Sequence, residues 1–409
     1  MSPSTRSLVL VLALLCCGCP RGHEAAGGRI PIRFSGYAGN PAETNLMEKL
    51  VKDFNTSQTE ITVSYEPVPG QYYPKMLTML VSKTAPDVFY LDVLQFKPFL
   101  AKHVLKPLTP FLVSSATTKK ADFLPTLWNS FAQDDQQWGI PKDFNCLALF
   151  YNTKMFDEAK VPYPDASWDL PRVREAAKAL TTPAHAGFCM SGDELARYMP
   201  VAWNYGAQLF NPDGHCGLGG PQAVEALGWY TGFRNQDKTG VLPSEVGSSW
   251  PGDVFGRQGA AMVFEGGWLV PYMAETFPKV DYGVTELPKG PAGSSNMLFT
   301  VSYVIPESCQ HPDAAWKVIE YLTSEASQAQ VTFALPSRRA EADKYAAARP
   351  KYQPILKGAE YARPYEFGAR GDRIKDRVGV AMQEVFLGVK GPQQALKDAA
   401  DDIDLLVKL

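Results

Sequence analysis

The sequence is short of the residues and motifs on which most enzymes and metal proteins depend. Five histidines are scattered through 409 residues, and no cluster has metal-ligand spacing. There is no GxSxG motif, no complete dinucleotide fingerprint and no phosphate-loop lysine, which disfavours hydrolase and nucleotide chemistry. A formal net charge of −3, with Lys and Arg dispersed, indicates no basic surface for nucleic acid. We therefore expect no metal, no cofactor, no nucleic-acid partner and no catalysis.

The N-terminus lacks an apolar run long enough to cross a membrane. Its run from Leu8 to Cys17 follows Arg6 and has the length of the apolar region of a signal peptide. We therefore expect residues 1–19 to be a signal peptide and residues 20–28 to form a flexible tether. The protein would be exported to the periplasmic or cell-surface face.

The run ends in LCCGC, where a small residue before a cysteine resembles a bacterial lipobox. Cys19 fits best as the lipidated residue, and Cys17 is the competing site. Two or three acyl chains on one cysteine would anchor the protein stably. We expect the lipid anchor to be its only membrane contact.

Four cysteines remain beyond that point: Cys146, Cys189, Cys216 and Cys309. No pair has CxxC spacing, so zinc is not expected. In an exported protein a Cys189–Cys216 disulfide and four buried thiols are both open interpretations, because sequence cannot determine connectivity.

The length predicts two lobes, since 409 residues exceed what one hydrophobic core usually supports. Strand-like segments at 30–35, 61–65 and 85–92 alternate with amphipathic helices, which indicates an α/β fold with a mainly parallel sheet. Ligands of such sheets bind beyond the carboxyl ends of the strands. Here those ends carry Tyr37 and Asp92.

The stretch from Trp138 to Lys160 predicts a crossing between the lobes. It begins as a loop with Gly139 and Pro141, continues as a strand over 146–151, and turns at Asn152 into a helix. We interpret it as half of a hinge. The return crossing is expected over 282–288, before a further strand at 299–305.

Several motifs occur in a recognisable order: APDV (85–88), WGIP (138–141), FGRQGAAMVFEGGW (255–268), YGVTELPKG (282–290), AAWKVIEYLTSE (314–325) and LPSR (335–338). Together they resemble the family 1 extracellular solute-binding proteins, the sugar and oligosaccharide receptors of bacterial ABC importers. The resemblance implies a two-lobed periplasmic-binding-protein fold, each lobe a mainly parallel sheet flanked by helices, joined by crossing hinge strands. We expect an N-terminal lobe from 29–145 and 288–332, and a C-terminal lobe from 146–287 and 333–409.

Sugar binding needs aromatic rings for the C–H faces and carboxylates or amides for the hydroxyls, on both sides of a closable cleft. Trp268, presented after the glycine pair that ends in Gly267, falls where the family has an aromatic platform; a core tryptophan is the alternative. Asp92 ends a strand at the mouth of the sheet and can also cap the following helix.

Other candidates come from the resemblance, each beside a structural alternative. Asn145 stands where some relatives present an acidic ligand-binding residue, and Asp143 can take that role. Glu43 matches a sugar-contact position, although a capping box explains it equally well. Arg338 matches an arginine that reaches the cleft, with a surface charge as the alternative. The remaining candidates are loop aromatics, and packing explains them nearly as well: Trp203, Trp250 and Tyr37.

The predicted function is a monomeric substrate-binding lipoprotein that captures a sugar or oligosaccharide and delivers it to ABC permease subunits by lobe closure. Phe299-Thr300-Val301 stands where relatives often have a second glycine–aromatic motif, which leaves the ligand class open. The alternatives are the same fold binding a glycerol phosphodiester or a polyamine, a sensor subunit, and a secreted carbohydrate-active enzyme.

Overall fold

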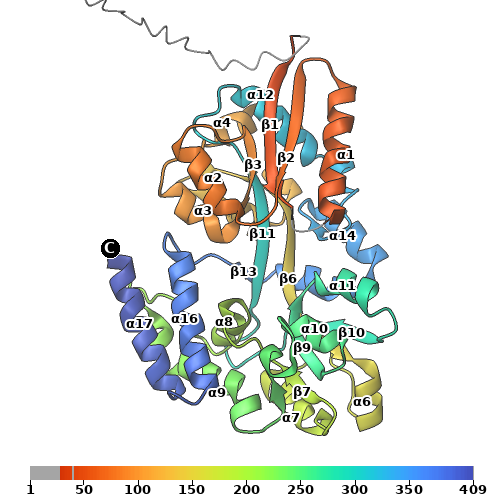
Figure 1. The fold of residues 1–409 in the computed structure, drawn as a ribbon, viewed down its shortest axis with the longest axis vertical. Helices are drawn as coiled ribbons and strands as arrows, with labels where there is room; N and C mark the ends of the chain where they lie inside the picture. Colours follow the sequence, from red (N-terminus) through yellow and green to blue (C-terminus); the bar gives the residue numbers. More distant parts are fainter. Residues whose placement is uncertain (1–27, 39–40, 409) are drawn as a thin grey trace, which may run out of the picture.

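The computed structural model of the chain describes residues 28–38 and 41–408, which form two α/β lobes arranged end to end (Figure 1). The expected signal peptide and both candidate lipidation sites, Cys17 and Cys19, lie outside these residues. Within the described ranges, no helix combines the length and apolar character needed to cross a membrane.

The N-terminal lobe confirms the predicted alternation of strands and helices. Its strands lie in the order β2-β1-β3-β11, with β1 parallel to both neighbours and β11 antiparallel to β3. Phe34, Tyr90 and Tyr303 are fully buried at its centre and meet edge to face. The elements are β1 (Ile30–Tyr37), α1 (Pro41–Ser57), β2 (Ile61–Val68), α2 (Tyr72–Val81), β3 (Val88–Asp92), α3 (Val93–Leu100), α4 (Thr109–Ser114), β4 (Ala132–Gln133), β5 (Gln136–Gln137), α12 (Pro312–Leu322) and α13 (Glu325–Gln328).

The C-terminal lobe has the strand order β6-β9-β7-β8 and a separate apolar cluster on each face of the sheet. Helices α16 and α17 lie side by side at its outer edge (Figure 1). The elements are α6 (Thr153–Ala159), α7 (Leu170–Leu180), β7 (Ala186–Cys189), α8 (Leu195–Asn204), α9 (Pro221–Asn235), β8 (Gly240–Val241), α10 (Pro251–Gly256), β9 (Ala260–Gly266), α11 (Leu269–Thr276), β10 (Tyr282–Thr285), α16 (Gly371–Phe386) and α17 (Pro392–Lys408).

Two long strands join the lobes. The first half of β6 pairs with β11, and its second half pairs with β9 and β10. The elements at this junction are β6 (Ile140–Asn152), β11 (Asn296–Val304), α5 (Pro125–Asn129), β12 (Leu335–Pro336), α14 (Arg339–Ala348), α15 (Gln353–Ala359) and β13 (Ala362–Pro364). The crossing predicted for the middle of the chain is therefore present in β6.

The crossing strand begins earlier than predicted. Ile140 and Pro141, expected in a loop, already belong to β6. A proline inside a sheet is tolerated where the hydrogen-bond ladder is irregular. The β6–β11 register shifts between Val301 and Ser302, opposite this part of β6, and supplies that irregularity.

The prediction of a return crossing at 282–288 is wrong. Those residues include β10, which pairs with β6 at 149–152, inside the C-terminal lobe. The return is made by β11, because its first residues pair with β13 and its last residues pair with β3. Sequence periodicity identifies a strand but carries no information about which strand it pairs with.

Candidate functional site

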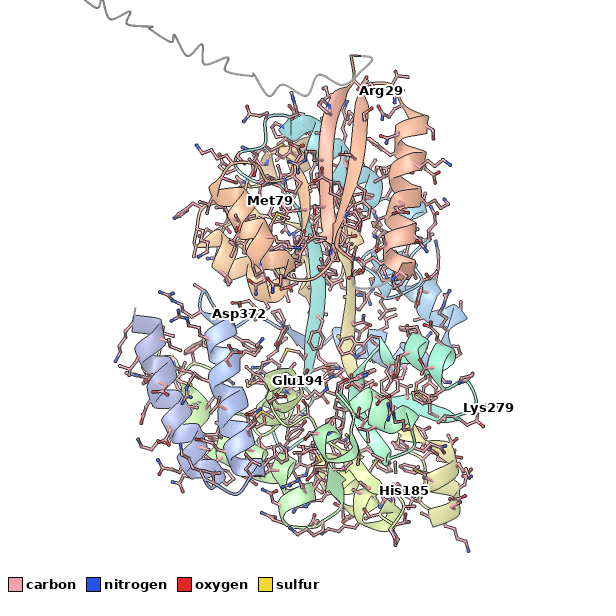
Figure 2. The ribbon with its side chains drawn as sticks, in the orientation of Figure 1. Arg29, Met79, His185, Glu194, Lys279 and Asp372 are labelled. Atoms are coloured by element: carbon pink, nitrogen blue, oxygen red, sulfur yellow. The ribbon has the colours of Figure 1, made fainter. Side chains whose placement is uncertain are left out.

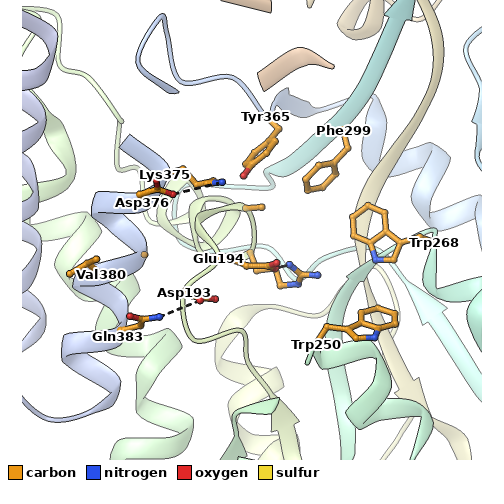
Figure 3. A pocket seen from close by; sticks show the side chains of 13 residues that line it. Asp193, Glu194, Trp250, Trp268, Phe299, Tyr365, Lys375, Asp376, Val380 and Gln383 are labelled. Atoms are coloured by element: carbon orange, nitrogen blue, oxygen red, sulfur yellow. Dashed lines mark hydrogen bonds and ion pairs between the residues drawn. The ribbon is translucent and has the colours of Figure 1, made fainter. Parts of the chain in front are cut away.

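A cavity of about 760 Å³ opens on the C-terminal lobe beside the crossing strands (Figure 3). Its volume lies within the ~300–1,000 Å³ that is usual for small-ligand sites. Its walls come from the start of α8, from β11, from the loops after β9 and β13, and from one face of α16. Within the described residues, nothing N-terminal to Asp193 lines it, so the cavity belongs to the C-terminal lobe and the junction, where Figure 2 labels Glu194.

Three aromatic rings from separate elements form one wall of the cavity. Trp268 and Phe299 meet edge to face with ring centroids 5.2 Å apart, and Phe299 and Tyr365 follow at 5.3 Å. Only a glycine at residue 266 leaves room for the Trp268 indole, because a Cβ there would lie 2.3 Å from the ring. The fourth aromatic, Trp250, lines the cavity below Trp268 in the view of Figure 3.

Buried charge fixes the Trp268 ring from behind. Glu265 is fully buried at the end of β9; its Oε2 accepts a hydrogen bond from Trp268 Nε1 at 2.7 Å. Its Oε1 accepts from Arg197 Nη2 at 2.6 Å, and Arg197 also pairs with Glu194 at the cavity surface. A hydrogen bond in which one partner is ionised is stronger than a neutral one, so the carboxylate of Glu265 holds the indole in one orientation.

The face of α16 contributes polar groups opposite the aromatic wall. Lys375 pairs with Asp376 at 3.8 Å, and Gln383 Nε2 donates to Asp193 Oδ2 at 3.2 Å (Figure 3). The cavity thus combines carboxylates and an amide with a wall of rings.

A second cluster of charge lies at the N-terminal-lobe end of β6. Lys142 is 2% exposed and pairs with Glu43 at 2.7 Å and with Asp143. Burial by itself would lower the pKa of Lys142, but attraction by the two carboxylates outweighs it and raises the pKa well above its ordinary value. The structure therefore places Glu43 and Asp143 together, as partners of a buried lysine.

Gly267 and Asn145 pack against each other. A Cβ at residue 267 would lie 2.3 Å from Asn145 Oδ1, so the glycine is required for packing against β6. That Asn145 oxygen is buried and has no hydrogen-bond partner within the described part of the chain. Neither residue lines the cavity.

Asp92 and Tyr37 lie in the N-terminal lobe, outside the cavity. Asp92 caps α3 by accepting from the backbone N–H of Gln95 at 2.9 Å, and burial raises the pKa of its carboxyl. Tyr37 packs edge to face on Tyr72 and Tyr90.

Arg338 and Trp203 are also placed away from the cavity. Arg338 is buried and bonds to Thr323, Thr117 and Asp122. The Arg363 guanidinium lies over the Trp203 ring, with its carbon 5.0 Å from the ring centroid. Of the residues predicted from the sequence, Trp268 and Trp250 are the two that line this cavity.

The Cys189–Cys216 disulfide is absent, since both thiols are free and buried. Cys189 lies on β7, where burial raises the pKa of its thiol. Cys216 lies before a short turn, where its backbone N–H donates to Asp404. The sequence spacing was compatible with a bridge, but pairing depends on the positions of the two Cβ atoms.

The family model for bacterial extracellular solute-binding proteins matches residues 38–329. The chain belongs to this family. A binding protein of Brucella abortus (strain 2308) is 26% identical over 373 residues, which are 88% of this chain and 89% of that protein.

Solved structures share the fold of this solute-binding protein. An ABC substrate-binding protein from Listeria monocytogenes, in complex with cycloalternan, aligns with a TM-score of 0.83 at 22% identity, covering 93% of this chain and all of that one. The protein UgpB of Mycobacterium tuberculosis, in complex with glycerophosphocholine, aligns with a TM-score of 0.80 at 17% identity, covering 93% and 99%. At these identities the likeness establishes the two-lobed architecture.

The sequence did not identify the charged and amide side chains that line the cavity of this solute-binding protein. They are Asp193, Glu194, Arg197, Lys375, Asp376 and Gln383. One signal was available for the charge behind the ring. Glu265 ends the apolar strand AAMVF, and a carboxylate at a buried strand end requires a cationic partner. That partner is Arg197, which lies 68 residues away in the chain, so no local pattern identifies it.

We expect Lys142→Met to lower the free energy of unfolding by about 3–5 kcal/mol, because it leaves two carboxylates buried without their cation. Urea denaturation at neutral pH measures the change. Lys49→Met is the matched control: Lys49 pairs with Asp53 on the surface of α1, and its loss should cost at most about 1 kcal/mol. Equal effects of the two substitutions would contradict the assignment of a buried ionic cluster.

We expect Glu265→Gln to lower stability by about 1–3 kcal/mol and to weaken the near-ultraviolet circular dichroism of Trp268, because the indole loses its charged acceptor. Glu194→Gln removes the other, half-exposed carboxylate of Arg197 and should change both quantities much less. The Trp268 signal is assigned from the difference spectrum of Trp268→Phe. An unaltered spectrum in Glu265→Gln would show that packing alone orients the ring.

Proposed function

We propose that this solute-binding protein is the substrate-binding component of an ABC importer, and that it captures a sugar or oligosaccharide between its lobes. The observation that carries the proposal is the wall of Trp268, Phe299 and Tyr365 facing carboxylates across one cavity. Aromatic rings cover the C–H faces of a sugar, and ionised carboxylates accept strongly from its hydroxyls. The cycloalternan bound by the Listeria protein of the same fold supports this choice.

The position of the cavity supports delivery by lobe closure. Its lining comes from the C-terminal lobe and the junction, so the N-terminal lobe supplies contacts by moving toward it. A ligand that touches both lobes shifts the equilibrium toward the closed form, which we propose the permease reads. Tyr37 and Asp92, at the strand ends of the N-terminal lobe, are the proposed contributors from that side.

Export, anchoring and assembly belong to the same proposal. Cys19 would carry the lipid that holds the protein at the membrane, and the protein would act as a monomer that performs no catalysis. The family's extracellular character and the lipobox-like LCCGC support this arrangement.

The charges that line the cavity distinguish between the two alternative ligand classes, glycerol phosphodiesters and polyamines. Both cations that line it, Arg197 and Lys375, are already paired with carboxylates, which disfavours a phosphodiester. Asp193 has an amide partner and no cation in the described part of the chain. A polyamine is therefore the second candidate, because an ammonium group could pair with that carboxylate.

Calorimetric titration of the purified protein decides between these ligands. The panel consists of mono- to tetrasaccharides, polyols, spermidine and glycerophosphocholine. We expect a saccharide to bind and to reduce the radius of gyration measured by small-angle scattering. Binding of spermidine alone would establish the second candidate, and no binding by any saccharide or polyol would overturn the proposal.

We expect Trp268→Ala to weaken saccharide binding by about 1–3 kcal/mol, the effect of losing an aromatic anchor. The variant should stay folded, with a lower free energy of unfolding because Glu265 Oε2 loses its indole donor. Trp138→Ala is the matched control, since Trp138 is also half-buried and donates its indole N–H, to Gln133 O at 3.2 Å, outside the cavity. Calorimetry with the same saccharide compares the two variants. Unchanged affinity in Trp268→Ala would assign the ring to packing.

A further inference from the structure

A second chamber of about 370 Å³ adjoins the cavity on the C-terminal lobe. The two spaces share four lining residues, Asp193, Glu194, Trp250 and Gln383, so they lie next to each other with these residues at their junction. Figure 3 shows the Gln383–Asp193 hydrogen bond and Trp250 on opposite sides of the first cavity. A ligand that passes between them would reach the second chamber.

The lining of the second chamber is hydroxylated and uncharged beyond this junction. Ser191, Ser244 and Ser249 face it together with apolar side chains, and no Lys, Arg or His of the described residues lines it. Ser191 is 5% exposed, and its hydroxyl is bonded to no other described residue. The carboxylates Asp193 and Glu194 lie at the junction, where their partners are Gln383 and Arg197. An anionic group entering the chamber would lose water without finding a cation, whereas a neutral hydroxylated group would find partners.

Trp250, which lines both spaces, is packed against a glycine in the same way as Trp268. A Cβ at residue 252 would approach the Trp250 ring to 2.1 Å, so Gly252 lies directly against the indole. Tyr272 supports the ring edge to face at 4.9 Å. Two glycine-backed tryptophans thus follow one another along the site, which suits a ligand that presents more than one sugar ring.

We propose that the second chamber is a subsite for the neutral, hydroxylated end of an oligosaccharide whose chain passes Trp250 into the C-terminal lobe. The inference rests on the proposed function. It adds the direction in which the bound oligosaccharide runs and the requirement that it contain more than one sugar unit. A monosaccharide would occupy the first cavity alone. A longer chain would gain affinity from Trp250 and the serine hydroxyls.

The test is calorimetry of the full mature chain with linear gluco-, galacto- and xylo-oligosaccharides of one to six units. In the series that binds, we expect affinity to rise about tenfold between the single sugar and the longer members, as an added aromatic contact allows. The double variant Ser244→Leu/Ser249→Leu should reduce that gain to about twofold and leave the affinity for the single sugar unchanged. Both serines are exposed, so folding is not at risk, and Ser114→Leu on α4 is the matched control.

Ser191→Ala gives an independent measurement, because it removes one hydroxyl from the chamber without adding bulk. We expect it to weaken the longer oligosaccharide several-fold and to spare the single sugar. Binding that is independent of chain length, or a length gain that survives in all variants, would overturn the subsite and leave the proposed function standing. Failure of every saccharide would remove both.

Discussion

The antiparallel pairing of β6 with β11 is the constraint on which the rest of the structure depends. Both strands belong to both lobes, so the two sheets are joined through one ladder of backbone hydrogen bonds. The pair also builds the site: Phe299 on β11 stands opposite Asn145 on β6, with Trp268 against the Phe299 ring. A change in the bend of these strands would therefore move the lobes and the aromatic wall together.

Buried charge stands at each end of this crossing. Lys142 lies between Glu43 and Asp143 on the side of the N-terminal lobe, and Glu265 binds Arg197 on the side of the C-terminal lobe. Ions are costly to bury, and apolar residues often stabilise a core equally well. We interpret the role of both clusters as the positioning of neighbouring segments and side chains. The first ties the start of α1 to the crossing strand, and the second fixes the indole that lines the cavity.

The fold could be predicted further than the site. Alternating strands and amphipathic helices and a helix cap at Asn152 depend on short segments, and the structure confirms them. The order of motifs along the chain indicated the family, which the family match confirms. Trp268 was identifiable because the glycine pair before it is a local signal. Arg338 shows the opposite case, since LPSR reads the same whether the guanidinium reaches a cleft or, as here, bonds to Thr117 and Thr323.

The sequence by itself determined the class of the protein, the number of lobes, the main strands of the N-terminal lobe, the crossing strand and one tryptophan that lines the cavity. These features depend on periodicity and on neighbouring residues, which one segment contains. Only the tertiary structure decided which strand returns between the lobes and which polar groups surround the ring. Lys375, Gly379 and Gln383 recur every fourth residue on one face of α16, a pattern visible in the sequence, but three rings that line the same cavity come from β11 and from the loops after β9 and β13. Contacts between segments so far apart arise from packing, and no local pattern encodes them.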